Sequence, residues 1–295
     1  MTPQKKPLVQ LLGAGRAGTM ISIALSRAGY RFSWVGSNKL EDARALAHKV
    51  GIGRYGVGFE GFRAKAGFLI LAVPDDEIRN AAAGSVRAGI ITGDTVAAHL
   101  SGALGSDVLE DAAQAGASVM AFHPAQTFTM TSKPASVFKN ICFDMEGDDT
   151  ACALGERAAA DLGAVSIRLD PSRRILSHLA MTAASNYTVS LMHIAEEIMA
   201  AAGIPKDKAG MMLHPLFSAT ANNIASIGTA DSLTGPVSRG DTNVLKKHFK
   251  ALENLDENYR TVFRELVSVA LKITAERGGI SEEKAKEIRK IIYRN

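Results

Sequence analysis

Short apolar runs alternate with segments of helical periodicity along the first 169 residues of the chain. The apolar runs predict strands near residues 8–12, 32–36, 55–59, 68–73, 95–100, 118–122, 141–145 and 165–168. Apolar residues at helical spacing predict helices near residues 19–25, 40–50, 76–87, 106–115 and 150–162. Strands that alternate with helices form parallel sheets covered on both faces, and right-handed crossovers make such sheets doubly wound. The first part of the chain is therefore expected to be a doubly wound, mostly parallel α/β domain.

The pattern changes at Asp170-Pro171, after which helical periodicity continues to the end of the chain. We therefore expect two domains, 1–169 and 170–295, of which the second is all-helical. Helices are predicted at 173–202, 206–227 (broken or kinked at Pro215), 241–251, 257–277 and 281–293. The first of them would be about 45 Å long at 1.5 Å per residue. That length favours a seam between two copies of the chain, and a central helix within one subunit is the alternative.

A glycine-rich turn follows the first predicted strand and precedes the first predicted helix. Its residues are Gly13, Ala14, Gly15, Arg16, Ala17 and Gly18. This is the dinucleotide fingerprint in the context that it requires, and it assigns the first domain to the Rossmann type. Gly13 permits the tight turn, Gly15 lets a diphosphate approach the backbone, and Gly18 lets the helix lie close to the strand. Free N–H groups at the start of the helix would face the phosphates.

The residues after the second predicted strand favour NADP over NAD. NAD-binding chains place a carboxylate there to hold the ribose 2′-hydroxyl. Here the strand is followed by Ser37, Asn38 and Lys39, and no carboxylate occurs before Glu41. These three side chains, with Arg16 from the glycine turn, can instead donate hydrogen bonds to a 2′-phosphate. A hydrogen bond to a charged group is worth about 1.5–3 kcal/mol, so two would change the preference more than tenfold. The alternative is that Lys39 only solvates a turn.

Ligands of open parallel sheets bind beyond the carboxyl ends of the strands. This rule selects three segments for the coenzyme and substrate: Val73-Pro74-Asp75 with the preceding Ala72, His99-Leu100-Ser101-Gly102, and His123-Pro124-Ala125-Gln126. Histidine titrates near neutral pH, so His99 and His123 are candidates to deliver a proton as hydride arrives. A histidine bonded to a loop carbonyl is the alternative for both rings. Asp75 or Asp76 is expected to cap the helix that follows.

Two features of the helical half are candidates for substrate binding. His178, Thr182, Asn186 and Ser190 recur every four residues and form one polar stripe on an otherwise apolar helix. Buried polar groups need partners, which a substrate or a neighbouring helix would supply. The segment Leu233-Thr234-Gly235-Pro236-Val237-Ser238-Arg239-Gly240-Asp241 reads as a turn in which Asp241 caps the next helix. Arg239 is a forked donor for a carboxylate, unless it pairs with Asp241.

Composition narrows the class of protein. The chain has 295 residues, of which 46% are hydrophobic and 22% charged, with a net charge of +4. The mild basic excess suits an anionic coenzyme, and no basic block with interleaved aromatics indicates nucleic acid. Two cysteines, Cys142 and Cys152, form neither a disulfide framework nor a metal site, and no metal is expected. Without a secretory leader or an apolar stretch of membrane-spanning length, we expect a soluble, cytoplasmic protein with no membrane partner.

These motifs together resemble one family. The glycine turn, the Leu71–Asp75 strand end, His99 with Ser101-Gly102, the Phe122–Phe128 segment and the 233–241 segment are similar to a largely uncharacterised group of Rossmann-like oxidoreductases. The helical domain of that group carries a Ser-Asn pair like Ser185-Asn186 and a preceding histidine like His178. More distant similarity is to pyrroline-5-carboxylate reductase, prephenate dehydrogenase and the 6-phosphogluconate/β-hydroxyacid dehydrogenases. The resemblance implies NAD(P)-dependent hydride transfer by dimers that bury their helical domains.

The chain departs from the β-hydroxyacid dehydrogenases at one position. Those enzymes place a catalytic lysine four residues before a helix asparagine, and Thr182 stands four residues before Asn186. The proton must therefore come from His123, His178 or water, with Asn186 orienting the substrate and Gln126, Thr182 and Arg239 binding it. The sequence predicts an NADP-dependent oxidoreductase acting on a small carboxylate-bearing carbonyl or imine. The alternatives are a non-catalytic dinucleotide-binding sensor and a deazaflavin-linked reductase.

Overall fold

The structure is a computed structural model that describes residues 5–62, 66–129, 132–134 and 136–293. The chain divides into two compact units, Met1–Ser185 and Asn186–Asn295. Every strand of the described residues lies in the first unit, and the second consists of helices and their connections. Along the sequence, the division falls after residue 185, whereas the expected boundary is near residue 170. The difference arises because helix α6 (Arg174–Ala184) belongs to the first unit.

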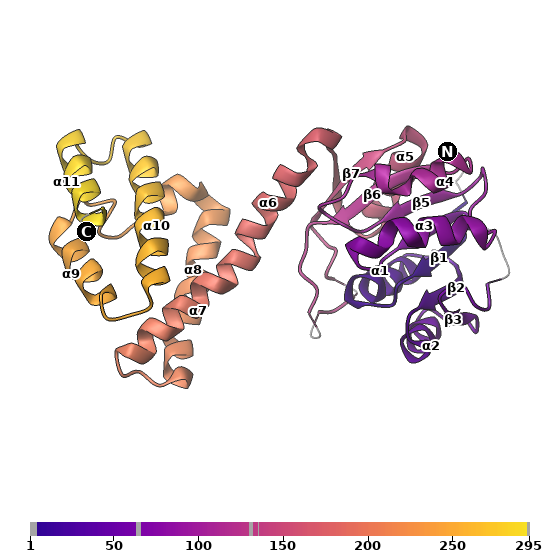
Figure 1. Ribbon diagram of the computed structural model, residues 1–295, viewed down its shortest axis with the longest axis horizontal. Helices are drawn as coiled ribbons and strands as arrows, with labels where there is room; N and C mark the ends of the chain where they lie inside the picture. The colour runs from indigo at the N-terminus through magenta and orange to yellow at the C-terminus, as the bar shows by residue number, and fades with distance from the viewer. Residues whose placement is uncertain (1–4, 63–65, 130–131, 135, 294–295) are drawn as a thin grey trace. The chain divides into compact units, whose positions relative to one another are not determined.

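The first unit is built on one sheet of eight strands in the order β3-β2-β1-β4-β5-β6-β7-β8 (Figure 1). Six of the seven strand pairs are parallel, and only β6 and β7 run antiparallel. The strands are β1 Val9–Leu12, β2 Phe32–Ser37, β3 Tyr55–Val57, β4 Phe68–Leu71, β5 Val96–His99, β6 Ser118–Pro124, β7 Cys142–Gly147 and β8 Val165–Arg168. All eight predicted strands are confirmed, with ends that differ by a few residues.

Helices cover both faces of this sheet, as the strand–helix alternation predicts. One apolar cluster joins the sheet to helices α1 (Arg16–Arg27), α2 (Leu40–Lys49) and α5 (Asp149–Asp161). A second cluster joins it to α3 (Ile78–Arg87) and α4 (Glu110–Gln114), each preceded by a 3₁₀ turn. The sheet is thus buried from both sides, which explains why its strands read as continuous apolar runs. The predicted Rossmann fold is confirmed.

The carboxyl ends of the central strands lie on one edge of the sheet. The register pairs Leu12 of β1 with Leu71 of β4, Leu71 with His99 of β5, and His99 with Ala121 of β6. Neighbouring strands are about 4.8 Å apart, so the glycine turn after β1 and the end of β6 are separated by three spacings, about 14 Å. This edge carries each of the strand-end segments that the sequence selects.

The second unit consists of α7 (Asn186–Ala201), α8 (Lys206–Ser232), α9 (Thr242–Leu252), α10 (Glu257–Glu276) and α11 (Glu282–Ile292). Its buried core comes mainly from the last three helices, and includes Leu245, Phe249, Leu271 and Ile288. Asp241 accepts a hydrogen bond from the Val244 amide at 3.1 Å, which confirms its predicted role as the cap of α9. Among the described residues, no helix is long and apolar enough to cross a membrane.

Two expectations about the helices are wrong. The single helix expected over 173–202 is two helices, because Ser185 (φ −113°, ψ −75°) departs from helical geometry between α6 and α7. The break expected at Pro215 comes elsewhere: Pro215 lies inside α8, and the backbone leaves helical angles at Gly228 (φ 81°, ψ 170°). A positive φ is readily adopted only by glycine, so Gly228 explains the position of the kink.

Candidate functional site

The glycine turn forms one wall of a cavity of about 580 Å³ in the first unit. The cavity is lined by Leu12, Gly13, Ala14, Gly15, Ser37, Asn38, Gly58, Phe59, Ala72, Val73, Pro74, Glu77, Asn80 and Ala81. These residues come from the ends of β1, β2 and β4, the loop after β3 and the start of α3. Eight of the residues that the sequence assigns to the coenzyme line this one space: Gly13, Ala14, Gly15, Ser37, Asn38, Ala72, Val73 and Pro74.

The three glycines of the turn differ in what a side chain would meet. Gly13 has a φ of 107°, and a Cβ there would overlap the carbonyl oxygen of Ala72. A Cβ on Gly18 would overlap the Gly13 carbonyl oxygen and lie 2.9 Å from the Cβ of Ala72. A Cβ on Gly15 would have no heavy atom within 4 Å. Gly13 and Gly18 are therefore required by the protein's own packing, whereas the space beside Gly15 is left open.

The start of α1 faces this open space with amides that have no partner within the helix. Gly15 is the N-terminal cap residue of α1, and its carbonyl oxygen accepts the first helical bond from the Thr19 amide at 2.8 Å. The preceding N–H groups of an α-helix have no partners within the helix. With the helix dipole they favour a negatively charged group at this position. A dinucleotide diphosphate therefore fits the turn, both by space and by charge.

The residues expected to choose between NADP and NAD are not all part of the cavity wall. Ser37 is buried at the end of β2, and Asn38 is exposed directly after it. Arg16 and Lys39 are exposed and adjoin the lining in sequence, at the first position of α1 and at the cap of α2. Ala17 follows Arg16 within α1. Within the part of the chain that the structure describes, neither Arg16 nor Lys39 forms an ion pair.

His99 makes its contacts entirely within the protein. The ring is fully buried, its Nε2 lies 2.9 Å from the carbonyl oxygen of Gly105, and its Nδ1 accepts the Ser101 amide at 3.2 Å. The neutral ring with hydrogen on Nε2 satisfies both contacts. Burial lowers the pKa of His99 to about 4, so this neutral form persists at neutral pH. The alternative considered for His99, a histidine bonded to a loop carbonyl, describes what the structure has.

Ser101 organises the loop after β5. Its Oγ donates to Oδ2 of Asp75 at 2.9 Å and accepts the amides of Ala103 and Leu104 at 3.1 Å. The expected cap of α3 by Asp75 or Asp76 is wrong, because the caps of the 3₁₀ turn and of α3 are Pro74 and Glu77, without side-chain bonds. Asp75 instead ties the loop after β4 to the loop after β5. The backbone at the mouth of these strands is thus fixed by side chains.

His123 lies on β6 and is bonded to a carboxylate that the sequence analysis did not select. Its Nδ1 lies 2.7 Å from Oδ2 of Asp144 on the neighbouring strand β7, where the two residues face each other in register. Oδ1 of Asp144 lies 3.0 Å from Nη1 of Arg174, the first residue of α6. His123 therefore has a carboxylate partner, and the loop carbonyl considered as its alternative is not what it binds.

His178 lies beside His123 in the same unit. The two ring centroids are 6.1 Å apart and the ring planes make an angle of 72°. Gly102 fits between them: a Cβ there would lie 2.6 Å from Cδ2 of His178 and 2.8 Å from Nε2 of His123. The structure thus brings together His123 and His178, the two histidines that remain as candidate proton donors, next to the residue that follows Ser101.

The remaining predicted substrate residues fall in several places. Thr182 is half-buried on α6, one turn beyond His178. Gln126 is exposed after β6, where its amide group bonds the backbone of Thr127 at 2.8 Å and of Val137 at 3.3 Å. Asn186 and Arg239 belong to the second unit, where Asn186 is exposed at the start of α7.

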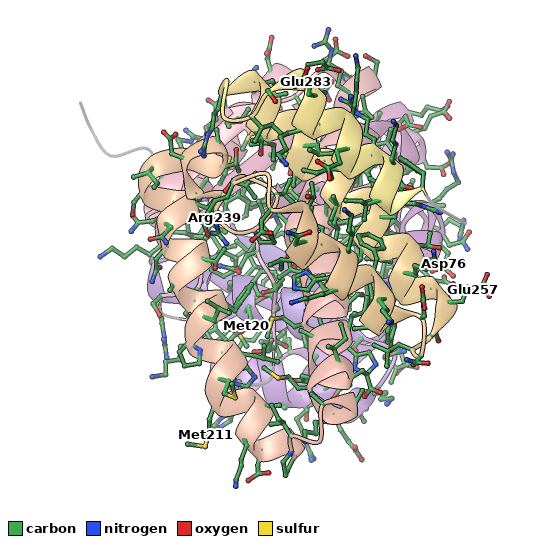
Figure 2. All side chains as sticks on the ribbon, turned by 90° about the vertical axis from the view of Figure 1, so that its left-hand side faces the viewer. Met20, Asp76, Met211, Arg239, Glu257 and Glu283 are labelled. Atoms are coloured by element: carbon green, nitrogen blue, oxygen red, sulfur yellow. The ribbon has the colours of Figure 1, made fainter. Side chains whose placement is uncertain are left out.

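Arg239 is exposed on the loop before α9 (Figure 2). The pairing of Arg239 with Asp241, the alternative considered for this loop, is absent among the described residues, since the Asp241 carboxylate caps α9. The guanidinium is thus available to a ligand.

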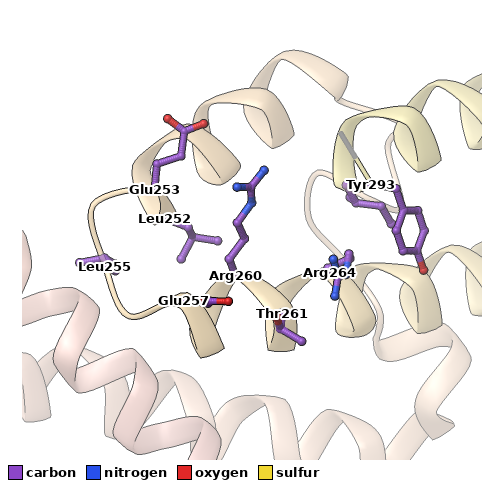
Figure 3. A pocket seen from close by; sticks show the side chains of 9 residues that line it. Leu252, Glu253, Leu255, Glu257, Arg260, Thr261, Arg264 and Tyr293 are labelled. Atoms are coloured by element: carbon purple, nitrogen blue, oxygen red, sulfur yellow. The ribbon is translucent and has the colours of Figure 1, made fainter. Parts of the chain in front are cut away.

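The helical unit has a hollow of its own of about 370 Å³, seen in Figure 3. Its charged lining residues are Glu253, Glu257, Arg260 and Arg264, two of each sign, and Tyr293 lies under the Arg264 guanidinium at 5.6 Å. None of the residues predicted for coenzyme or substrate lines it. The mixed charge gives it no preference for an anionic ligand.

Both parts of the chain match known domain families. Residues 3–124 match the Rossmann-like domain, and residues 141–269 match a domain of unknown function, DUF2520. The chain thus matches a Rossmann-like domain and, after it, a DUF2520 domain. The DUF2520 match begins at β7, so it includes Asp144, Arg174 and His178, whereas His123 falls at the end of the Rossmann-like match. The histidine cluster is therefore built from both matched regions.

Solved structures share this two-part fold over nearly their whole lengths. A candidate NADP oxidoreductase from Bacteroides fragilis is 25% identical, with a TM-score of 0.75 over 90% of this chain and 98% of that one. A protein from Thermotoga maritima is 24% identical, with a TM-score of 0.73 over 92% and 99%. A pyrroline-5-carboxylate reductase from Coxiella burnetii is 18% identical, with a TM-score of 0.59 over 96% and 99%. No curated protein matches the chain.

Proposed function

We propose that this protein is an NADP-dependent oxidoreductase that transfers hydride to or from the carbonyl or imine carbon of a small carboxylate-bearing substrate. The observation that carries the proposal is the glycine turn, where Gly13 and Gly18 are closely packed while Gly15 faces open space in a 580 Å³ cavity. The likeness over 90% of the chain to a candidate NADP oxidoreductase supports the same coenzyme.

The residues after β2 support the choice of NADP. In the proposed complex Ser37 and Asn38 donate to the 2′-phosphate from the cavity wall, and Arg16 and Lys39 supply positive charge beside it. Hydrogen bonds to a charged group contribute about 1.5–3 kcal/mol each. A carboxylate that would hold a free 2′-hydroxyl is missing from this strand end. The diphosphate lies over Gly15 and the first amides of α1.

NADPH, when bound, supplies the hydride, and the histidine cluster manages the accompanying proton. Nδ1 of His123 faces Asp144, so Nε2 is the nitrogen that remains for a substrate. In the direction of reduction, hydride adds to the substrate carbon while His123 gives its Nε2 proton to the substrate oxygen or nitrogen. In the reverse direction the same nitrogen accepts that proton. His178, across Gly102, is the second group that can exchange it.

Polar side chains hold the substrate in this proposal. Arg239, whose guanidinium has no partner among the described residues, is suited to a carboxylate, and Asn186, Thr182 and Gln126 orient the reacting group. A carboxylate-bearing substrate also agrees with the net charge of +4. No nucleic acid or membrane takes part in this function.

The experiment that tests this function follows NADPH oxidation with a panel of 2-keto acids and cyclic imines. The wild-type protein is expected to oxidise NADPH with at least one of them. His123→Ala is expected to lower turnover about 100-fold or more while NADPH affinity stays within about twofold, because general acid catalysis contributes about 10²–10⁴-fold. Unchanged turnover in His123→Ala would remove this residue from the mechanism.

A second candidate function is a dinucleotide-binding sensor without catalysis. It is favoured by Thr182, which occupies the position where the β-hydroxyacid dehydrogenases that the chain resembles have a catalytic lysine. The same panel separates the two functions. NADPH binding without oxidation of any substrate would support the sensor.

We further propose that the working form is a homodimer joined through the helical unit. Apolar side chains are exposed on α7 and α8 of one unit, among them Tyr187, Val189, Met211, Leu216 and Ile227. Met211 is 77% exposed, and Figure 2 shows it on α8. Contiguous exposed apolar patches mark interaction sites, and a second copy of the same helices would cover these side chains. Light scattering of the wild type and of Leu216→Glu tests this, with a dimer and a monomer expected.

The two thiols support a reducing, cytoplasmic location as part of the same proposal. Cys142 and Cys152 are both free in the described structure, and burial raises the pKa of each thiol. Cys152 is buried and Cys142 half-buried, and buried free thiols behave as small apolar side chains.

A further inference from the structure

Asp144 contacts two residues that come from different parts of the chain. Its Oδ2 lies 2.7 Å from Nδ1 of His123, and its Oδ1 lies 3.0 Å from Nη1 of Arg174. Nη2 of Arg174 donates to the carbonyl oxygen of Ser101 at 2.7 Å. Asp144 is 5% exposed and Arg174 only 2%. A continuous chain of contacts thus runs from β6 through β7 and α6 to the loop after β5.

A buried ion pair of this kind is a poor way to stabilise a fold. Removing two charges from water costs several kcal/mol each, and well-packed apolar residues are often at least as stable. The fit here is also incomplete, because Nε of Arg174 has no hydrogen-bond partner within the described residues, and the Nη1–Oδ1 contact lacks hydrogen-bond alignment. The position of the pair, with one carboxylate oxygen on His123, indicates what it does instead.

Asp144 selects the hydrogen position on the His123 ring. A carboxylate accepts hydrogen bonds and donates none, so Nδ1 must carry the hydrogen in this contact. The neutral ring then has its free electron pair on Nε2, and the protonated ring has its exchangeable proton there. Nε2 and its ring neighbour Cε1 are the two atoms of His123 that a Cβ on Gly102 would approach to 2.8 Å. With Nδ1 bonded to the carboxylate, the ring therefore presents its Cε1–Nε2 edge, which carries the reactive nitrogen, to Gly102.

Arg174 fixes the second histidine through the helix. Arg174 and His178 are four residues apart on α6, so their side chains lie on the same face, one turn from each other. The ion pair of Arg174 with Asp144 and its hydrogen bond to the Ser101 carbonyl hold this face against β7 and the loop after β5. That places His178 edge-on to His123 at 6.1 Å. One guanidinium thus sets where His178 lies.

We propose that Asp144 and Arg174 are positioning residues for a histidine pair: Asp144 holds His123 with hydrogen on Nδ1 and Nε2 toward Gly102, and Arg174 holds His178 beside it. Their significance for turnover rests on the proposed oxidoreductase function, whereas the tautomer and the ring contact do not depend on it. Neither residue touches the reacting atoms.

The test measures the His123 ring directly by ¹⁵N NMR of the full-length protein, at a pH where the ring is neutral. The wild type is expected to carry hydrogen on Nδ1 of His123, and hydrogen on Nε2 would overturn the proposal without any variant. Asp144→Asn is expected to mix the two tautomers, because an amide can accept or donate. Asp144→Glu, which keeps the carboxylate, is expected to restore Nδ1–H.

Glu146→Gln is the matched control. Glu146 is a second buried carboxylate on β7, two residues beyond Asp144, and it bonds the amide and hydroxyl of Ser106. Its neutralisation is expected to leave the His123 tautomer unchanged. A tautomer that moves equally in Glu146→Gln and Asp144→Asn would mean that any lost carboxylate on β7 disturbs the ring, and would contradict a specific role for Asp144.

The contact between the His123 and His178 rings tests whether Arg174 holds His178 in place. The nuclear Overhauser effect between His123 and His178 is expected in the wild type and in Arg174→Lys, and its loss is expected in Arg174→Met. Kinetics then connect these findings to function: Asp144→Asn is expected to lower kcat about 100-fold with little change in KM for NADPH. If the wild type fails to bind NADPH, the proposed function is wrong and the NMR results still decide the positioning roles. If Asp144→Asn keeps hydrogen on Nδ1 of His123 and keeps the wild-type kcat, the proposed positioning role of Asp144 is wrong.

Discussion

Gly102 lies so close to the rings of His123 and His178 that a Cβ on it would be 2.8 Å from Nε2 of His123. The same atom would lie 2.6 Å from Cδ2 of His178. Real Cβ atoms essentially never approach other side chains this closely, so both rings occupy space that only glycine leaves. The loop that carries Gly102 is fixed on both sides, by Arg174 at the Ser101 carbonyl and by His99 at the Gly105 carbonyl. The rings therefore depend on this residue for their positions.

Gly102→Ala is expected to displace His123 and His178 and to lower turnover at least about tenfold. An added methyl group in a packed site costs about 1–3 kcal/mol, which the rings relieve by moving. NADPH affinity is expected to stay within about twofold, because Gly102 does not line the cavity beside the glycine turn. Steady-state kinetics and fluorescence of bound NADPH measure the two quantities. Wild-type turnover in this variant would contradict the importance of the ring positions.

Two substitutions in the glycine turn are expected to have different effects, one on NADPH binding and the other on the free energy of unfolding. Gly15→Ala is expected to weaken NADPH binding about tenfold or more and to change the free energy of unfolding by less than about 1 kcal/mol, because its Cβ meets nothing in the protein. Gly18→Ala is expected to destabilise the fold by about 1–3 kcal/mol, because its Cβ overlaps the Gly13 carbonyl oxygen. Calorimetric titration and denaturant unfolding of both variants provide the comparison. Tight NADPH binding by Gly15→Ala would place the diphosphate elsewhere.

Coenzyme preference is expected to change with one carboxylate at the end of β2. Asn38→Asp is expected to weaken NADPH binding about tenfold or more, because the carboxylate repels the 2′-phosphate, and to leave NADH binding equal or tighter. Asn258→Asp makes the same chemical change on α10 and should alter neither affinity. Equal losses for both coenzymes in Asn38→Asp would show that Asn38 does not face the 2′ position.

The buried His99 predicts how stability depends on pH. Its pKa is about 4 in the folded protein and about 6.5 in the unfolded chain, so below pH 6.5 the unfolded state binds more protons. Stability is therefore expected to fall as the pH drops from 6.5 to 4, by about 3 kcal/mol from this group, and to show no further loss from it below pH 4. His99→Asn should remove this part of the slope, whereas substitution of the exposed His48 by Asn should retain it. Denaturant unfolding at several pH values measures both.

The sequence predicted the first unit well because its signals are local. A strand buried on both faces reads as a continuous apolar run, and a glycine turn between a strand and a helix needs only adjacent residues to be recognised. The roles assigned to Gly13, Gly15 and Gly18 agree with the packing found around each of them. The cap of α9 by Asp241 is another local signal, since the acceptor and the amide are three residues apart.

The sequence did not identify Asp144 and Arg174 as site residues, because their partners are distant along the chain. Asp144 is 21 residues from His123, and Arg174 is 73 residues from Ser101. Neither stands in a motif. One signal was present: Asp144 is the only charged residue of the predicted strand 141–145, and a carboxylate inside a strand must find a partner when it is buried. The partner itself follows only from the antiparallel register of β6 and β7, which the alternation of strands and helices does not predict.

Helix caps and breaks were likewise predicted wrongly where the local sequence rule did not decide the structure. Asp75 satisfies the local rule for a helix cap and yet bonds Ser101 from the next strand end, because that contact organises the loop. Pro215 satisfies the local rule for a helix break, but α8 leaves helical geometry at Gly228. No residue type marked the break at Ser185, since the segment 174–201 lacks both glycine and proline.

Calorimetric titration of the wild-type protein with NADPH and with NADH tests the proposed coenzyme site most directly. NADPH is expected to bind saturably at one site per chain, at least about tenfold more tightly than NADH, with a matching rise in melting temperature. The absence of heat and of any melting-temperature change with both coenzymes would contradict the central claim that the turn at Gly13–Gly18 receives a dinucleotide diphosphate.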